Sequence, residues 1–227
     1  MTQTAVCFDL DDTLYDYHEY AKAGLAAAAD LVHRRSGKRV HGDLLSAYFD
    51  PNVDAGTFDV LLESYDFPSL SVDDLVDAFH EDARGSLDPY PETEHVLDSL
   101  ASQHALGLIT DGRGGHSKLD RLGIREHFDS VLVTHDHGRS KHERGVFEDV
   151  LADLDVHPTR ATYVGDDPRV DFRVPNELGM TTVRLRRGRY VDLEPEDDAA
   201  APDYEIGSLD GLLSAIPTMH AERGVVE

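Results

Sequence analysis

Two clusters of aspartates in this sequence each follow directly after a short apolar run. Residues 5–8 (AVCF) lead into Asp9-Leu10-Asp11-Asp12-Thr13, and residues 161–164 (ATYV) lead into Gly165-Asp166-Asp167-Pro168 with Asp171 close behind. Side chains alternate along a strand, so Asp9 and Asp11 are expected on one face. Two carboxylates about 4 Å apart repel by about 4 kcal/mol at an intermediate dielectric. A divalent cation is the usual compensation, and oxygen ligands with phosphate chemistry favour Mg²⁺.

Two further segments could bind a phosphate group. Thr110-Asp111-Gly112 ends another apolar run, and a hydroxyl followed by backbone N–H groups at a helix start can hold phosphate oxygens. Lys141 is one of only four lysines and lies in a polar loop before a helical pattern. Each feature also has a plainer interpretation, because Asp and Thr are common helix caps and a loop lysine is usually solvated.

The elements that carry these residues alternate between strand and helix. Apolar runs typical of buried strands occur at residues 5–10, 106–110, 130–134, 161–164 and 181–185. Helical patterns separate them at residues 92–103, 116–122, 144–154 and 170–178. This order predicts an α/β fold, a Rossmann-like doubly wound parallel sheet with helices on both faces.

Residues 16–89 interrupt the alternation with helical patterns only, at residues 20–35, 43–49, 56–65 and 72–84. We therefore predict a catalytic core of residues 1–15 and 90–227 and an inserted all-helical domain of residues 16–89. The stiff return segment Asp88-Pro89-Tyr90-Pro91 suits a hinge. Ligands bind beyond the carboxyl ends of parallel strands, and the insert leaves from such an end, so we expect it to act as a lid.

In order and spacing, the motifs Asp9-x-Asp11-x-Thr13, Thr110, Lys141 and Gly165-Asp166-x4-Asp171 resemble those of the haloacid dehalogenase-like hydrolase superfamily. The insert resembles the helical cap of the first type found in its phosphatase branch. The resemblance extends to about Leu213, which is nearly the whole chain.

The resemblance implies a magnesium-dependent phosphohydrolase that cleaves a small phosphate monoester. Asp9 would be the nucleophile and form an aspartyl phosphate, and Asp11 would act as general acid and then as general base. Asp9, the Asp11 carbonyl and Asp166 would hold Mg²⁺. Thr110, Asp111, Gly112 and Lys141 would bind the phosphate, and Thr110 and Lys141 would also neutralise the charge on its equatorial oxygens during catalysis.

The supporting acids and two departures from the family pattern complete the expected site. Asp171 would hold Lys141 or the outer shell of the metal, and Asp167 could take one of these roles. The second motif more often reads Thr-Asn-Gly, so Asp111 adds negative charge beside the phosphate. The lysine is more often followed by proline than by His142, which leaves the placement of Lys141 open.

Several alternative functions remain compatible with the pattern. A haloacid dehalogenase needs neither a metal nor a proton for an alkoxide, so Asp11 and the second acidic cluster disfavour it. A phosphomutase would share the core and differ in the cap. A signalling module or a silent phosphate-binding protein is a further class, although receiver modules are about half this length and lack a cap.

Composition limits the partners. The chain has 227 residues and a formal net charge of −24, from 45 acidic and 21 basic residues. Such a charge argues against nucleic acids and anionic membranes and favours a halophilic protein stabilised by salt. The single cysteine excludes an intrachain disulfide, and we see neither a signal peptide nor an apolar run of about 20 residues, so we expect a cytoplasmic protein. The identity of the metabolite and the oligomeric state do not follow from the sequence.

Overall fold

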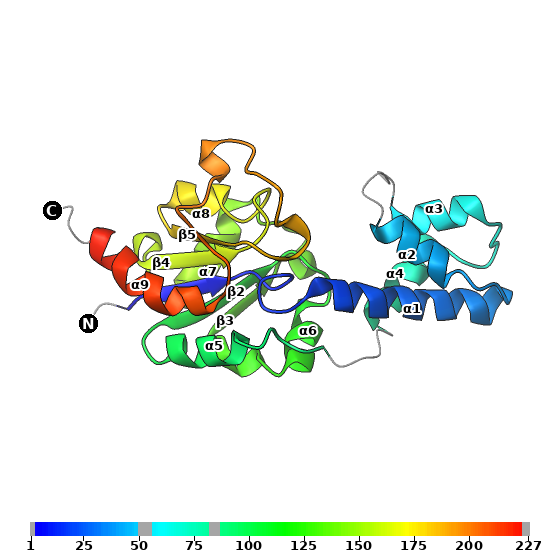
Figure 1. Ribbon diagram of the computed structural model, residues 1–227, viewed down its shortest axis with the longest axis horizontal. Helices are drawn as coiled ribbons and strands as arrows, with labels where there is room; N and C mark the ends of the chain where they lie inside the picture. The colour runs from blue at the N-terminus through cyan, green and yellow to red at the C-terminus, as the bar shows by residue number, and fades with distance from the viewer. Residues whose placement is uncertain (1–2, 50–55, 82–86, 224–227) are drawn as a thin grey trace. The chain divides into compact units, whose positions relative to one another are not determined.

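The computed structural model describes residues 3–49, 56–81 and 87–223 of the chain. The chain forms two compact units, one from Met1–Asp16 with Leu87–Glu227 and the other from Tyr17–Ser86. The first is an α/β unit and the second is entirely helical in its described residues. Both are drawn in Figure 1.

The core unit is built on a six-stranded sheet in the order β3-β2-β1-β4-β5-β6, and every neighbouring pair is parallel. Its strands are β1 (Ala5–Phe8), β2 (Ala105–Thr110), β3 (Ser130–Val133), β4 (Ala161–Gly165), β5 (Thr181–Leu185) and β6 (Tyr204–Ile206). The first five follow the predicted apolar runs. Strand β6 was not predicted from the sequence, because three residues are too few to show a strand pattern. These residues are also partly exposed at the sheet edge.

The core helices flank this sheet on both sides (Figure 1). They are α5 (Thr93–Ala101), α6 (Gly115–Leu122), α7 (Arg144–Asp153), α8 (Arg173–Leu178) and α9 (Asp210–Arg223). Helices α5 and α9 contact each other in one layer, and α7 and α8 contact each other in the other. The predicted doubly wound fold is therefore confirmed, although α8 begins three residues later than its apolar pattern.

Strand β1 lies where the strand order reverses, because it pairs with β2 on one side and with β4 on the other. The connections leaving β1 and β4 therefore diverge and open a crevice at the carboxyl end of the sheet. In open α/β sheets, this switch point is the usual ligand site. Both predicted aspartate clusters lie there, since Asp9 follows β1 and Asp166 follows β4.

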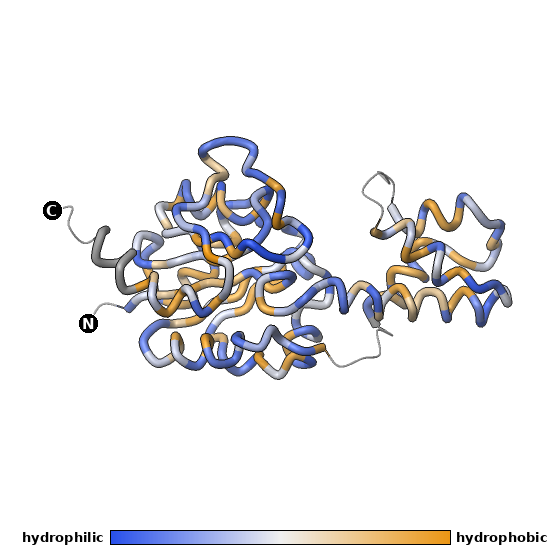
Figure 2. The backbone as a smooth tube through the Cα atoms, in the orientation of Figure 1, coloured by the Kyte–Doolittle hydropathy of each residue, from blue (hydrophilic) through white to orange (hydrophobic). Residues whose placement is uncertain are grey.

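Every residue of β1, β2, β4 and β5 is buried, and the side chains of β1 and β2 are mostly apolar. Figure 2 shows hydrophobic residues concentrated along these strands and on the inward faces of the helices. One cluster joins Cys7 and Tyr163 on the sheet to Phe147 and Val150 on α7. This packing fixes the strand ends from which the catalytic candidates project.

The helical unit contains α1 (Tyr17–Ser36), α2 (His41–Phe49), α3 (Thr57–Ser64) and α4 (Val72–Glu81). Helices α1 and α4 pack closely, with the ring of Phe79 against Gly24. All four match predicted helical patterns, and residues 82–84 of the last pattern lie outside the described residues. This confirms an inserted helical cap. Within the described ranges, no helix has the length and apolarity that crossing a bilayer requires.

Candidate active site

All of the predicted site residues line one pocket of the core unit at the sheet switch point. The pocket has a volume of about 100 Å³. Asp9 lines this pocket and is held there by the backbone, because its N–H donates to the carbonyl of Val164 on β4 at 2.8 Å. The other lining residues are Asp11, Thr110, Asp111, Gly112, Lys141, Asp166, Asp167, Val170, Asp171, Arg189 and Tyr190.

Lys141 lies at the centre of the acidic groups. Its Nζ donates to Oδ1 of Asp9 and, at 2.8 Å, to Oδ1 of Asp171. Burial lowers the pKa of this ammonium, but Asp171 and Asp9 outweigh that effect and raise the pKa well above its usual value. Lys141 therefore stays charged and can attract a phosphate anion. The absence of proline after it has not moved it away from the site.

Asp171 is a support for Lys141 and for the loop after β4. Its Oδ1 accepts from Lys141 and from the hydroxyl of Tyr163 at 3.2 Å, and its Oδ2 accepts from the N–H of Asp167 at 2.9 Å. Gly165 permits this arrangement, since a Cβ there would lie 2.3 Å from Asp171 Oδ2. A side chain at position 165 would displace the carboxylate.

Asp9, Asp166 and Asp171 form a buried cluster whose oxygens lie within 4.8 Å of one another. Asp166 Oδ1 accepts a bond from Thr13 at 3.3 Å, whereas its Oδ2 is buried with no hydrogen-bond partner among the described residues. When all three carboxylates are ionised and Lys141 is charged, two negative charges of the cluster have no counter-charge hydrogen-bonded to them among the described residues. An orphaned carboxylate oxygen and a charge of this size fit a divalent cation with oxygen ligands.

The pKa values of the cluster show how costly its charge is without a cation. Burial raises the pKa of Asp9 from 3.8 to about 7; Asp171 and Asp11 add to the rise, and Lys141 opposes it. Burial, together with the charge of Asp9, raises the pKa of Asp166 well above its usual value. A bound cation would favour the ionised carboxylates that a nucleophile and a metal ligand require.

The Asp11 carboxylate accepts hydrogen bonds from two side chains that were not predicted from the sequence. Lys118 Nζ lies 2.8 and 2.9 Å from the two oxygens of Asp11, and the Tyr15 hydroxyl donates to Oδ1 at 2.5 Å. Burial alone would raise the pKa of Asp11, but the ion pair with Lys118 outweighs it and lowers the pKa. One signal was available, because Lys118 occupies the buried stripe of α6 with Gly115, Leu119 and Leu122.

The Asp111 carboxylate lines the pocket and is held in place by neutral hydrogen-bond donors. Its Oδ1 accepts from the hydroxyl of Thr134 at 2.5 Å and from the backbone N–H of Lys141 at 3.0 Å. Thr110 lies next to it at the end of β2, and its hydroxyl accepts the N–H of Gly112 at 3.3 Å. Asp111 thus connects the second motif to the loop that carries Lys141.

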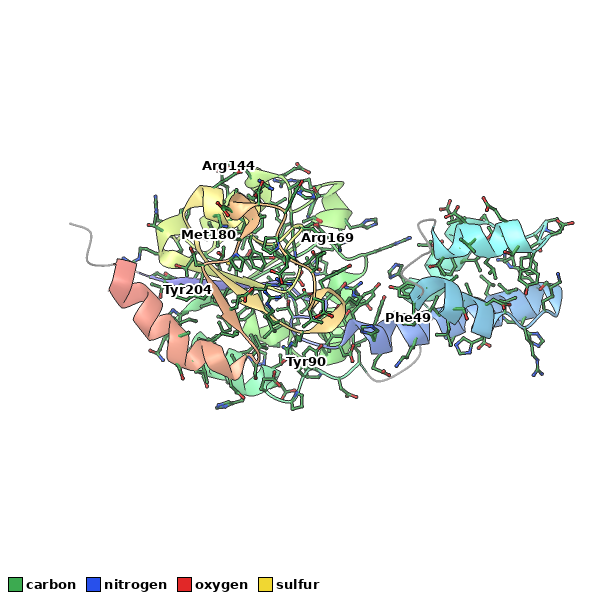
Figure 3. The ribbon with its side chains drawn as sticks, turned by 45° about the horizontal axis from the view of Figure 1, so that its top comes forward. Phe49, Tyr90, Arg144, Arg169, Met180 and Tyr204 are labelled. Carbon is green, nitrogen blue, oxygen red and sulfur yellow. The ribbon has the colours of Figure 1, made fainter. Side chains whose placement is uncertain are left out.

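Asp167 and Asp12 are paired with arginines. Arg169 binds the Asp167 carboxylate through Nε and Nη2, at 2.9 and 2.8 Å, and lies on the core unit (Figure 3). Asp167 lines the same pocket but is not one of the three acids in the cluster that fits a cation. Asp12, fully buried, accepts from Arg189 Nε at 2.5 Å, which brings Arg189 to the pocket wall. Neither Arg189 nor Tyr190 was predicted, because their contacts join segments far apart in the chain.

The sequence of this chain is similar to those of known proteins. The family profile described as haloacid dehalogenase-like hydrolase matches residues 6–185. A glyceraldehyde 3-phosphate phosphatase of Methanopyrus kandleri is 34% identical over 224 residues, covering 93% of this chain and 96% of the relative. One from Methanocaldococcus jannaschii is 31% identical over 231 residues, covering 94% and 97%.

A solved structure gives the same fold over its whole length. The 2-haloacid dehalogenase from Pseudomonas syringae pv. Tomato superposes with a TM-score of 0.67 at 25% identity, covering 98% of this chain and 99% of that one. The profile spans the core motifs and the insert between them, and both relatives are phosphatases. The chain belongs to the haloacid dehalogenase-like hydrolase family, in its phosphatase branch with a helical cap.

Proposed function

We propose that this phosphatase is magnesium-dependent and cleaves small phosphate monoesters through an aspartyl phosphate on Asp9. The observation that carries the proposal is the pocket in which Asp9 meets Lys141, Asp171 and the unpartnered oxygen of Asp166. A nucleophilic carboxylate, a cation-binding pair of acids and a fixed ammonium are the groups that phosphoryl transfer needs.

In the first step an oxygen of Asp9 forms a bond to phosphorus while the bond from phosphorus to the ester oxygen breaks. The proton on Asp11 passes to the departing oxygen. In the second step water attacks the aspartyl phosphate, gives a proton to Asp11, and releases inorganic phosphate and the Asp9 carboxylate. Asp11 must be protonated for the first step and ionised for the second, and its lowered pKa favours the second form.

The remaining residues bind and orient the phosphoryl group. Lys141 and Thr110, with the N–H of Gly112, lie at the pocket and supply positive charge and hydrogen-bond donors to the phosphoryl oxygens. Asp171 holds Lys141 in place and Asp111 holds its backbone. Asp9 and Asp166, with the carbonyl of Asp11, would hold Mg²⁺, which would neutralise charge on the phosphoryl group.

The substrate class that fits best is a small phosphorylated metabolite, with three-carbon sugar phosphates as the first candidates. The support is the name of the two archaeal relatives, which match over almost their full length. A dehalogenase with the same fold is the second candidate, given the Pseudomonas syringae structure. Asp11 at the pocket and the orphaned oxygen of Asp166 favour the phosphatase, because dehalogenation requires neither a proton for an alkoxide nor a cation.

Substitution of the two aspartates tests the mechanism. Asp9→Asn should neither turn over p-nitrophenyl phosphate nor accumulate a phosphoenzyme. Asp11→Asn should still phosphorylate Asp9 with this substrate, whose leaving group needs little protonation, and then stall because no base activates water. General acid–base catalysis contributes roughly 10²–10⁴-fold, so turnover should fall by that order.

The measurement is the intact mass of each variant, quenched shortly after mixing with substrate. Added phosphate on the Asp11→Asn protein and none on the Asp9→Asn protein is expected. A phosphate on the Asp9→Asn protein would overturn the assignment of the nucleophile. The wild-type protein assayed with a haloacid separates the second candidate function, since halide release without phosphatase activity would replace the proposal.

A further inference from the structure

The ammonium of Lys118 is buried beside the proposed active site. Its side chain is 2% exposed, yet it comes from α6, a helix on the outside of the sheet. It reaches the carboxylate of Asp11, 107 residues earlier in the chain, and contacts both carboxylate oxygens. A lysine on the buried stripe of a short helix is unusual, because charged side chains are rarely buried unless paired.

Stability alone is a weak reason for such a pair. Desolvating two charges costs several kcal/mol per ion, and apolar side chains of similar volume often serve a fold as well or better. Leucines occupy neighbouring positions of the same stripe, at Leu119 and Leu122. The partner of the lysine, in contrast, is a residue of the catalytic pocket. The ion pair is therefore better explained by its effect on the Asp11 carboxylate than by a contribution to the stability of α6.

Three segments converge on this one carboxylate. Lys118 comes from α6, while Tyr15, which is fully buried, donates its hydroxyl from the loop after β1. The third segment is the turn after β2, where Gly112 leaves the room that the pair occupies. A Cβ at Gly112 would lie 2.8 Å from Asp11 Oδ2 and 3.0 Å from Lys118 Nζ. Asp11 is thus held by donors on one side and by a close backbone on another.

We propose that Lys118 is a positioning residue of the reaction, whose ammonium, together with the Tyr15 hydroxyl, fixes the Asp11 carboxylate where it exchanges protons with the leaving group and with water. The inference rests on the proposed function of Asp11. Lys118 acts through Asp11 and does not itself have to touch the substrate. Proton transfer in a transition state depends on geometry, so loosening Asp11 should slow the steps that need it.

This role predicts a dependence on the leaving group. An alkyl phosphate such as glycerol 3-phosphate expels a basic alkoxide and needs a well-placed acid. p-Nitrophenyl phosphate expels a stable phenolate and needs little help. Loss of Lys118 should therefore slow phosphorylation of Asp9 by the alkyl phosphate much more than by the aryl phosphate. A merely structural role would lower both rates by the same factor.

The experiment compares the rates of phosphoenzyme formation in single-turnover quench experiments with the two substrates. Lys118→Met keeps the length of the side chain and removes its charge. The ratio of the aryl to the alkyl rate should rise at least tenfold over that of the wild-type protein, with KM for either substrate changed less than kcat. Tyr15→Phe, which removes one donor, should raise the ratio by a smaller factor, and Lys118→Arg should restore most of the wild-type ratio.

Lys22→Met is the matched control, because Lys22 is half-exposed on the helical unit and its Nζ pairs with Glu19 at 2.7 Å. Its ratio should equal that of the wild-type protein. A wild-type ratio in folded Lys118→Met and Tyr15→Phe proteins would overturn the positioning role. If Lys118→Met does not fold, the Tyr15→Phe and Lys118→Arg proteins decide. Failure of the wild-type protein to form a phosphoenzyme with either substrate would overturn the proposed function itself.

Discussion

When ionised, the carboxylates at the switch point bear a charge that their hydrogen-bonded partners among the described residues neutralise only in part. Lys141 compensates for one of the three acids in the cluster of Asp9, Asp166 and Asp171. Burial raises the pKa of Asp9 to about 7, and repulsion from Asp171 and Asp11 adds to the rise. A cation in this cluster would therefore compete with protons for the same oxygens.

Metal dependence follows, together with a direction in pH. Because the folded pKa of Asp9 lies above its unfolded value, this group favours the folded state below about pH 4, and its contribution is lost as pH rises to about 7. Mg²⁺ binds the ionised form, so its stabilisation should grow through the same window. We expect the rise in Tm caused by a fixed Mg²⁺ concentration to be larger at about pH 8 than at about pH 5.5.

Differential scanning fluorimetry measures this rise, with KCl of equal ionic strength as the control for screening. In the matching activity assay, EDTA should abolish hydrolysis of p-nitrophenyl phosphate and Mg²⁺ should restore it. Full activity in metal-free buffer, or a Tm rise that shrinks as pH increases, would contradict the assignment of the cluster.

Asp111 gives the second prediction at this scale. Its Oδ2 accepts from the N–H of Lys141 at 3.3 Å, and its Oδ1 accepts from Thr134 and, at 3.0 Å, from the same N–H. Asp111→Asn keeps that oxygen and removes a negative charge near the phosphate, so affinity for inorganic phosphate should rise by up to about tenfold. Asp111→Ala leaves two donors without an acceptor, which should cost about 1–3 kcal/mol of stability and weaken phosphate binding.

The measurements are inhibition constants for inorganic phosphate and urea unfolding of both variants. The Asn variant is the control for the Ala variant, because the two share the loss of charge and differ in the acceptor. Equal stability and equal phosphate affinity of the two variants would show that the acceptor does not hold the Lys141 loop.

Site residues next to an apolar run could be predicted from the sequence, whereas the side chains that contact them in the folded protein could not. Asp9, Thr110 and Asp166 each follow a buried strand, and parallel strands bring their carboxyl ends to one edge. Lys118 and Arg189, in contrast, reach the site from a helix and a loop through contacts that no local pattern encodes. Their catalytic roles, like those of the predicted residues, remain proposals until the variants are assayed.

Among the elements, length and apolarity decided what the sequence revealed. Five strands of the core are runs of four or more mostly buried residues, and they were predicted close to their observed bounds. Strand β6 has three residues, with Glu205 exposed in the middle, and its place depends on pairing with β5. A strand this short, which is held by pairing with its neighbour, has no periodic pattern in its own sequence that could be detected.

The helical unit allows a test of element packing. Gly24 lies in α1 where that helix meets α4, and a Cβ at Gly24 would come within 2.6 Å of a ring carbon of Phe79. That ring cannot move away easily, because Tyr20, Tyr48 and Phe58 surround it. Gly24→Ala should therefore destabilise the unit by about 1–3 kcal/mol despite the better helix propensity of alanine.

Gly42 in α2 supplies the control, since a Cβ there meets nothing within 4 Å. Gly42→Ala should be neutral or stabilising by up to about 1 kcal/mol. Urea unfolding monitored by circular dichroism compares the two, the chain having no tryptophan to report by fluorescence. A Gly24→Ala protein as stable as the Gly42→Ala protein would mean that α1 and α4 can separate at little cost.

Over the whole molecule the dominant feature is the excess of acid. With 45 acidic and 21 basic residues, the formal charge of 24 carboxylates is not balanced by Lys or Arg. Some of the other carboxylates form exposed ion pairs, such as Asp197 with Arg173 and Glu194 with Arg186. Surface pairs of this kind contribute about 0–1 kcal/mol each, so they do not offset the repulsion. The cytoplasmic location and the halophilic character stay predictions of the sequence.

Salt weakens both the attraction within the surface ion pairs and the repulsion among the surplus carboxylates. The first effect destabilises the folded protein only slightly, because the exposed pairs contribute little. The second effect stabilises it, because the repulsion acts over long distances among many charges. The screening length falls from about 10 Å at 0.1 M to about 3 Å at 1 M, so most of the relief should come in this range. We expect Tm to rise steeply between about 0.1 M and 2 M KCl.

A variant with fewer charges separates repulsion from general effects of salt on water. Glu94→Gln, Asp120→Asn and Glu126→Gln together change exposed residues of the core unit outside the pocket and reduce the net charge from −24 to −21. This triple variant should have a higher Tm than the wild-type protein at about 0.1 M KCl and a smaller rise toward 2 M. If repulsion is not the cause, the two proteins will respond to KCl with the same slope. A Tm that stays flat for the wild-type protein would show instead that repulsion among the surplus carboxylates does not limit its stability.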